Sequence, residues 1–147
     1  MGSREDNVER VRRGYDLFLA GQLDEALLMF DPEIVVEDRP DSPDAATFSG
    51  REGFQKYLMA WLEPWEEFSL EAEAFHATDN EVVAFIRQWG RVRGINATVE
   101  ERVAHVWTVG PDDTAIRYRV FTSRDEALLA VGLGGCHGRS EPAYRAA

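Results

Sequence analysis

Cysteine and long apolar runs are both scarce in this sequence. Cys136 is the single cysteine, which excludes an intrachain disulfide, and the spacing of cysteine and histidine matches no zinc site. The longest nearly apolar stretch, "ALLAVGLGG", is far shorter than the ~20 residues of a membrane-spanning helix. No basic segment followed by an apolar one opens the chain, so no secretory signal is visible. We therefore expect a cytoplasmic protein with no metal and no cofactor.

Positive charge is scarce as well. The 147 residues include 16 Lys and Arg against 27 Asp and Glu, which gives a net charge of −11. Nucleic acids and anionic membranes are held by clusters of Lys and Arg, so this balance argues against both kinds of partner. A glycine-rich phosphate loop and the G-x-S-x-G motif of hydrolases are missing too. Three classes stay open: small-molecule enzymes, small-molecule binding proteins and dimerisation modules.

The spacing of apolar residues predicts one α+β domain. Intervals of three and four predict helices over about 7–20, 23–30 and 51–62, with a strand over 33–38 before the third helix. From Phe68 onward the interval becomes two, and four strand-like segments separated by short turns predict an antiparallel meander. Ser123 and Glu126 have the spacing of a capping box and predict a short last helix.

Together these elements predict a cone-shaped roll, in which three N-terminal helices pack on a strongly curved antiparallel sheet. We expect residues 1–6 to be an N-terminal extension, residues 7–133 to form the domain, and residues 134–147 to be a flexible C-terminal tail. A curved sheet closed by helices has a mouth that suits a small-molecule pocket.

The stretch "FDPEIVVEDRP" ends a strand in two adjacent acids, Glu37 and Asp38. Alternation along the strand places Asp38 on the same side as Ile34 and Val36, which are expected to meet the helices, and Glu37 on the other side. We therefore expect Asp38, not Glu37, to be the carboxylate of a cavity. An acid at the rim of an apolar pocket loses hydration and can serve as a general base. The alternative is a solvated strand-end acid or a cap for the following loop.

The segments "AGQLDEALLMFDPEIVVED" and "AHVWTVGPDDTAIRYRVF" resemble the nuclear transport factor 2-like superfamily, and within it ketosteroid isomerases and SnoaL-like polyketide cyclases. The resemblance covers about residues 7–133 and implies the cone fold. It also implies that Asp38 is the general base. In those isomerases a helix tyrosine and a strand acid donate to the substrate oxygen; the matching positions here are Gly14, next to Tyr15, and Ala104. Two of three catalytic positions depart from the pattern, so true ketosteroid isomerase activity is not expected.

The register of the last two strands decides which side chains enter the pocket. In the preferred register Ala104 faces inward, which turns Arg102, Arg117 and Arg119 toward a substrate, where guanidinium groups can stabilise an enolate or alkoxide. A shift by one residue would instead turn inward Arg87, Trp89, His105, Trp107 and Tyr118. The candidate pocket residues beside Asp38 are Tyr15, Phe18, Tyr57, Trp61, Gln88, Arg102, Arg119 and Phe121.

The leading functional hypothesis is a cofactor-free acid/base enzyme of the isomerase, cyclase or hydrolase type. It would act through Asp38 on a small, mostly apolar carbonyl or epoxide compound. The alternatives are a non-catalytic small-molecule binding protein and a dimerisation module with the same fold. The preferred register also predicts an apolar patch on the outer face, and hence a two-fold homodimer, from Trp89, Val103, His105, Trp107 and Tyr118.

Overall fold

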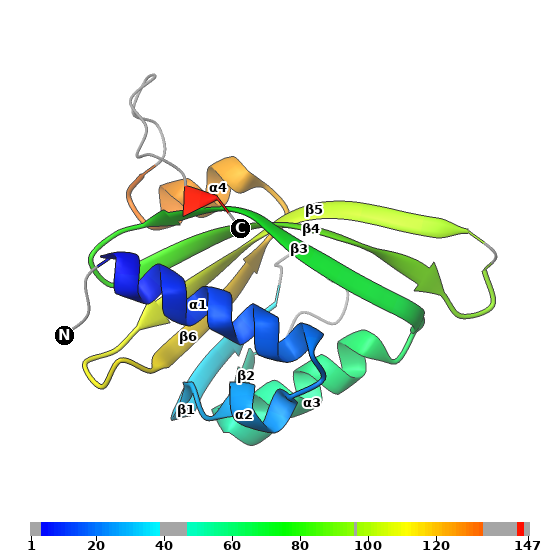
Figure 1. Ribbon diagram of the computed structural model, residues 1–147, viewed down its shortest axis with the longest axis horizontal. Helices are drawn as coiled ribbons and strands as arrows, with labels where there is room; N and C mark the ends of the chain where they lie inside the picture. Colours follow the sequence, from blue (N-terminus) through cyan, green and yellow to red (C-terminus); the bar gives the residue numbers. More distant parts are fainter. Residues whose placement is uncertain (1–3, 39–46, 96, 134–143, 146–147) are drawn as a thin grey trace.

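The computed structural model describes residues 4–38, 47–95, 97–133 and 144–145 of the chain. Within these ranges the helices are α1 (Arg4–Leu19), α2 (Leu23–Leu27), α3 (Gly50–Leu62) and α4 (Arg124–Ala130). Helices α1, α2 and α3 lie on one side of the sheet and α4 on the other (Figure 1). The three predicted N-terminal helices are therefore confirmed, although α1 begins at Arg4, inside the expected extension.

The strands are β1 (Phe30–Glu37), β2 (Thr47–Ser49), β3 (Trp65–Ala77), β4 (Glu81–Val92), β5 (Thr98–Val109), β6 (Ala115–Phe121) and β7 (Tyr144–Arg145). Among the described residues they form one sheet in the order β2-β1-β6-β5-β4-β3-β7. Strands β3 to β6 make the predicted antiparallel meander, and the α+β cone is confirmed.

The sheet is mixed, whereas the sequence predicted antiparallel pairing throughout. Strand β1 runs parallel to β6, with Val36 beside Tyr118 and Glu37 beside Arg119. The two strands lie far apart in the chain, so no tight turn between them dictates their relative direction. This pairing brings the end of β1, where Asp38 follows, beside the middle of β6.

The curvature of the sheet has a local cause in β3. Its register against β4 shifts between Trp65 and Glu67 and again between Ala72 and Ala74, and such bulges bend a strand. Gly90 lies opposite the first bulge, where any Cβ would collide with the backbone carbonyl of Glu67. The bends leave a concave face toward α1, α2 and α3.

The predicted tail falls mostly outside the described residues. The part that is described, β7, pairs with Ala74 and Phe75 of β3. The boundaries expected for the domain stay a prediction. In the part of the chain that the structure describes, no helix combines the length and apolar character needed to cross a membrane.

Each face of the sheet has its own apolar core. The main core lies between the concave face and α1–α3, and its fully buried members include Ile34, Phe75 and Ile86. A smaller cluster lies under α4 on the convex face and consists of Val83, Ala104, Val106 and Ala127. Ser123 caps α4 by accepting a hydrogen bond from the Glu126 backbone N–H, as the predicted capping box requires.

Candidate functional site

A cavity lies between the concave face of the sheet and helices α1 and α3, and it has two chambers. The larger has a volume of about 90 Å³ and is walled mainly by apolar side chains, among them Val11, Phe30 and Phe54. The smaller has a volume of about 50 Å³ and contains Asp38 in its wall. The chambers are adjacent, because both are lined by Phe18, Leu58, Leu70, His105 and Tyr118.

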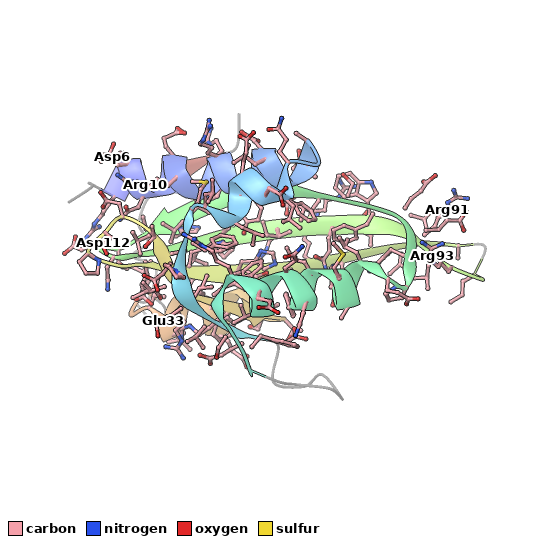
Figure 2. The ribbon with its side chains drawn as sticks, turned by 90° about the horizontal axis from the view of Figure 1, so that it is seen from below. Asp6, Arg10, Glu33, Arg91, Arg93 and Asp112 are labelled. Carbon is pink, nitrogen blue, oxygen red and sulfur yellow. The ribbon has the colours of Figure 1, made fainter. Side chains whose placement is uncertain are left out.

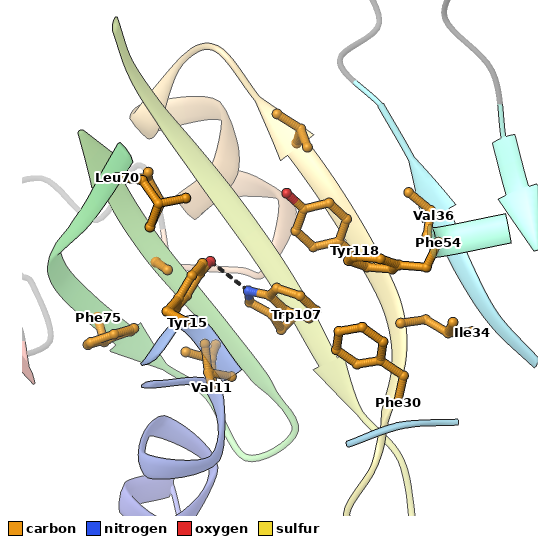
Figure 3. Packing of buried hydrophobic residues seen from close by; sticks show 14 of the residues in the cluster. Val11, Tyr15, Phe30, Ile34, Val36, Phe54, Leu70, Phe75, Trp107 and Tyr118 are labelled. Carbon is orange, nitrogen blue, oxygen red and sulfur yellow. Dashed lines mark hydrogen bonds between the residues drawn. The ribbon is translucent and has the colours of Figure 1, made fainter. Parts of the chain in front are cut away.

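A chain of hydrogen bonds crosses the wall of the larger chamber, and Figure 3 shows its first bond, between Trp107 and Tyr15. The Trp107 indole N–H donates to the Tyr15 hydroxyl oxygen over 2.8 Å, and that oxygen is 2.7 Å from His105 Nδ1. All three side chains are buried. Burial raises the pKa of Tyr15 far above its ordinary value, against the hydrogen bond from Trp107, so the phenol stays protonated.

Asp38 lies at the meeting point of β1 and the smaller chamber. The Tyr57 hydroxyl of α3 donates to Asp38 Oδ1 over 3.4 Å, which is long for a hydrogen bond. Tyr118 is buried beside them, and its pKa is raised well above the ordinary value by burial first and then by Tyr57, Tyr15 and Asp38 nearby. A carboxylate and two phenols thus converge on one apolar space.

Glu37, the neighbouring acid, lies on the convex face. Its carboxylate accepts two hydrogen bonds from Arg117, over 2.7 and 3.1 Å. These bonds hold the pKa of Glu37 below its ordinary value. The alternation of β1 therefore separates the two acids as predicted, with Asp38 alone in the cavity wall.

Six of the nine candidate site residues line the cavity and three do not. Those in the walls are Tyr15, Phe18, Asp38, Tyr57, Trp61 and Gln88. Gln88 is buried in the wall of the smaller chamber and donates from its amide nitrogen to Glu101 over 3.1 Å. The other three, Arg102, Arg119 and Phe121, lie on the convex face.

The preferred register of β5 and β6 was therefore wrong by one residue. On β5, Val103, His105 and Trp107 face the cavity, while Ala104 packs under α4. The physical reason is that the segment from Val103 to Trp107 is buried on both faces, so its apolar residues did not reveal which face meets the helices. On β6 the same shift turns Tyr118 and Val120 inward and the arginines outward.

The arginines expected in the pocket make ion pairs outside it. Arg102 donates to Glu73 over 3.2 Å and Arg119 to Glu81 over 3.0 Å. Arg119 is the more enclosed, and burial together with neighbouring Arg117 lowers its pKa from the ordinary arginine value. Among the residues that the structure describes, Arg10 is the one arginine in the walls of the two chambers.

The patch expected on the outer face is likewise mostly internal. Val103, His105, Trp107 and Tyr118 line the cavity, and of the expected patch only Trp89 lies on the convex face. There the Arg87 guanidinium stacks 4.3 Å from the centre of the Trp89 ring. Arg87 and Trp89 lie outside because they pair across the strands with Arg102 and Glu100.

The preferred register missed five cavity residues, Val103, His105, Trp107, Tyr118 and Val120. The resemblance to ketosteroid isomerases pointed to the neighbourhood of two polar cavity residues. Tyr15 is one residue from the position expected for the helix tyrosine, and His105 is one residue from Ala104, the position expected for the strand acid. The structure brings both side chains to the same cavity.

Charged side chains lie at the two ends of the sheet. Figure 2 shows Arg91 and Arg93 at one end and Asp112 at the other. At the Asp112 end, Arg10 of α1 is 3.4 Å from the Asp113 carboxylate, and both side chains border the larger chamber. Among the described residues, no group of three or more His, Cys, Asp or Glu side chains could hold a metal ion.

Residues 11–119 match the model of the SnoaL-like domain family. The chain belongs to this family. No curated protein matches.

Several solved structures share the fold. An NTF2-like protein of unknown function from Burkholderia pseudomallei is 18% identical over 86% of this chain and 97% of its own, with a TM-score of 0.71. SalBIII, an epoxide hydrolase/cyclase-like enzyme of pyran ring formation in the polyether salinomycin, is 18% identical over 82% and 93%, with a TM-score of 0.69. RV0760c from Mycobacterium tuberculosis, solved with estradiol-17β-hemisuccinate, is 15% identical over 80% and 94%, with a TM-score of 0.66. At these identities the likeness shows the fold alone.

Proposed function

We propose that this SnoaL-like protein is a cofactor-free acid/base enzyme that acts on a small, mostly apolar carbonyl or epoxide compound. Asp38 is the proton-transferring group. The observation that carries the proposal is the position of this carboxylate, in the wall of a chamber otherwise lined mainly by aromatic and aliphatic side chains.

The surroundings of Asp38 suit proton transfer. Its backbone continues β1, whose neighbouring side chains Ile34 and Val36 are fully buried, so the short carboxylate has little freedom to move. Tyr57 approaches Oδ1 from α3, and Tyr118 contributes a second phenol that burial keeps protonated. A base and two neutral hydrogen-bond donors in one apolar chamber are the groups that enolisation or epoxide opening requires.

Relatives of the same fold support a small-molecule role. SalBIII is named as an epoxide hydrolase/cyclase-like enzyme, and RV0760c holds a steroid ester. An apolar cavity suits both kinds of ligand, and this chain has one between its sheet and helices.

A binding protein without catalysis is the second candidate. It is favoured by the larger chamber, in which the polar atoms of Trp107, Tyr15 and His105 bond to one another and the remaining wall is apolar apart from Arg10 and Asp113 at its border. Such a chamber holds a ligand by burial alone.

The test compares turnover by two variants that each lose one acid, Glu33 in β1 or Asp38 directly after it. Asp38→Asn removes the base and preserves shape, whereas Glu33→Gln changes an exposed acid of the same strand (Figure 2). Each protein is incubated with monocyclic β,γ-unsaturated ketones and monocyclic epoxides, and products are followed by NMR. We expect turnover by the wild type and by Glu33→Gln, and a loss of about a hundredfold or more in Asp38→Asn. Binding of these compounds without turnover by the wild type would favour the second candidate, and equal turnover by all three proteins would remove Asp38 from the mechanism.

The predicted homodimer is also a proposal. Its surface would be the convex face around Trp89, because the other expected patch residues are inside. Light scattering of the wild type and of Trp89→Ala tests it. A monomer mass for the wild type at micromolar concentration would contradict it.

A further inference from the structure

Gly14 occupies an interior position of helix α1, Arg4–Leu19. Glycine in the middle of a helix is less stable than alanine, because its backbone loses more conformational freedom on folding and it has no side chain to pack. The backbone of Gly14 is helical, with no positive φ that would favour glycine. The conformation of α1 therefore gives no reason for a glycine at this position.

The surroundings of Gly14 give no packing reason either. The other seven glycines that the structure describes either have a positive φ or would bring a Cβ into contact with another part of the chain, as Gly90 would with the Glu67 carbonyl. A Cβ added at Gly14 would meet no atom within 4 Å, apart from its chain neighbours and the nearby backbone of its own helix. Gly14 thus combines a helical backbone with open space where a side chain would lie.

The open space at Gly14 belongs to the larger chamber. Arg10, Gly14 and Phe18, each one helical turn from the next, lie in its wall together with Val11 and Tyr15. The Cα–Cβ bond of a helical residue points toward the start of the helix, so a side chain at residue 14 would lie over the turn that carries Arg10 and Val11. A larger residue at this position would therefore narrow the chamber along α1.

Gly14 also lies where the larger chamber meets solvent. Val11 and Tyr15 on the same helix are buried, whereas Gly14 and Arg10 are partly exposed. Figure 2 shows Arg10 at the same end of the molecule as Asp112 of the turn between β5 and β6. The partly exposed wall residues outside α1 are Leu23, Met29, Leu58, Val109, Asp113 and Ala115. The chamber is therefore open along one edge of α1, and most of that edge is apolar.

The volumes of the chambers limit what they can enclose. About 90 and 50 Å³ together are comparable with the ~150 Å³ of an engineered cavity that holds benzene. One ring fills this space, so a larger ligand has to extend out of it. The open edge at Gly14 gives an apolar substituent such a path, past Phe18, Leu23 and Met29.

We propose that Gly14 is a specificity-determining residue, whose missing side chain lets the larger chamber accept a ring that carries an alkyl chain. The ring lies inside, and the chain runs over Gly14 toward solvent. The inference rests on the proposed function and deepens it, because it names the substrate class as a monocyclic compound with an apolar chain. The helix tolerates an unfavourable residue at this position in exchange for the opening.

The binding test uses two one-ring probes, toluene and n-butylbenzene, which differ in the length of one alkyl chain. Calorimetry gives both affinities for the wild type, Gly14→Ala and Gly14→Leu, after circular dichroism has shown that each protein is folded. We expect the n-butylbenzene affinity to fall about fourfold in Gly14→Ala, the equivalent of one buried methylene group, and about tenfold or more in Gly14→Leu. Toluene, which lies inside, should lose less.

The matched control is Asp16→Leu, which adds the same side chain on the exposed side of α1. It should bind both probes as the wild type does. An unchanged n-butylbenzene affinity in Gly14→Leu, or an equal loss in Asp16→Leu, would overturn the inference.

Thermal unfolding separates an opening for ligands from a packing requirement. Because alanine is the better helix former and has room at this position, Gly14→Ala should raise the midpoint of thermal unfolding by about 3 °C while it weakens n-butylbenzene binding. A lowered midpoint would show that packing requires the glycine and would overturn the inference. Gly14→Ala carries the test by itself if Gly14→Leu does not fold.

The outcomes also distinguish this inference from the proposed function. If toluene binds the wild type and n-butylbenzene does not, no chain leaves the chamber at Gly14, and the inference fails while the proposed function stands. If neither probe binds, the cavity takes no ring, and both fail. Equal turnover by the wild type and Asp38→Asn would remove the proposed mechanism without changing the effect of Gly14 on binding.

Discussion

The two faces of the sheet differ in how their polar side chains are paired. On the concave face the polar groups are neutral and bond to one another, as in the chain from Trp107 through Tyr15 to His105. On the convex face they are charged and paired, as in Glu37 with Arg117 and the two arginines around Glu73. Among the described residues, Asp38 is the carboxylate in the wall of the smaller chamber, where it lies with aromatic side chains such as Tyr57 and Tyr118.

The difference follows from access to water. Ion pairs at partly exposed sites keep much of their hydration, so charged side chains lie there at little cost. In a closed apolar cavity a charge loses its hydration, so neutral donors and acceptors are favoured and an acid is costly. A carboxylate retained in such a place is a candidate for chemistry rather than for stability.

The largest effect that distinguishes the faces should come from removing aromatic volume. Phe75 is completely buried in the main core, and Phe75→Ala should cost about 3–5 kcal/mol of unfolding free energy. Phe121 of the convex face is partly exposed beside the smaller cluster, so Phe121→Ala should cost clearly less. Urea unfolding of both variants measures the difference. Equal losses of unfolding free energy would show that the two cores contribute equally to stability.

A smaller effect should follow from removing one hydroxyl on each face. Tyr15→Phe leaves the Trp107 N–H and His105 Nδ1 buried without their partner, which should cost about 1–3 kcal/mol. Thr108→Val removes a bond of 3.3 Å to Glu81 at a partly exposed site and should cost less than about 1 kcal/mol. Urea unfolding is the measurement for this pair as well. A Tyr15→Phe protein as stable as the wild type would contradict the hydrogen-bond chain.

Added salt should change the stability cost of removing a polar group on the convex face but not on the concave face. Glu73 accepts hydrogen bonds from Arg102 over 3.2 Å and from Arg124 over 2.6 Å. Glu73→Gln should cost at most about 1 kcal/mol at low ionic strength, and the cost should shrink in about 1 M NaCl because exposed charges are screened. The cost of Tyr15→Phe should not change with salt. Thermal unfolding at the two salt concentrations measures these costs. A cost of Glu73→Gln that does not change with salt would argue against the ion pairs.

The smallest effect should be the pH dependence of Glu37. Arg117 holds the pKa of Glu37 below its ordinary value of 4.5, so this group binds fewer protons in the folded state than in the unfolded state. Its stabilisation is present above the ordinary pKa and is lost as the pH falls through the lowered folded value. The wild type should exceed Glu37→Gln in unfolding free energy by about 0.5 kcal/mol near neutral pH, and the gap should close in acid, below the lowered folded pKa. Urea unfolding across this range tests the sign, and a gap that widens in acid would refute it.

Part of the site was predictable because it depends on local spacing. Side chains alternate between the two sides of β1, and the apolar side can be recognised from a few residues. This alternation placed Asp38 and Glu37 on opposite sides. The capping box at Ser123 and the α1 stripe that carries Tyr15 are local in the same way. The face of β5 was not predictable, because Ala104 and Val106 are as buried as Val103 and His105.

The sequence by itself determined the order of helices and strands apart from the short β2 and β7, the α+β class and the side of β1 on which Asp38 lies, since each depends on intervals of two to four residues. Only the tertiary structure decided the rest. The parallel pairing of β1 with β6 and the packing of α4 on the convex face join segments far apart in the chain. Those contacts assign small apolar residues to one face of β5 and His105 and Trp107 to the other, and so they determine which polar groups meet Asp38 in the cavity.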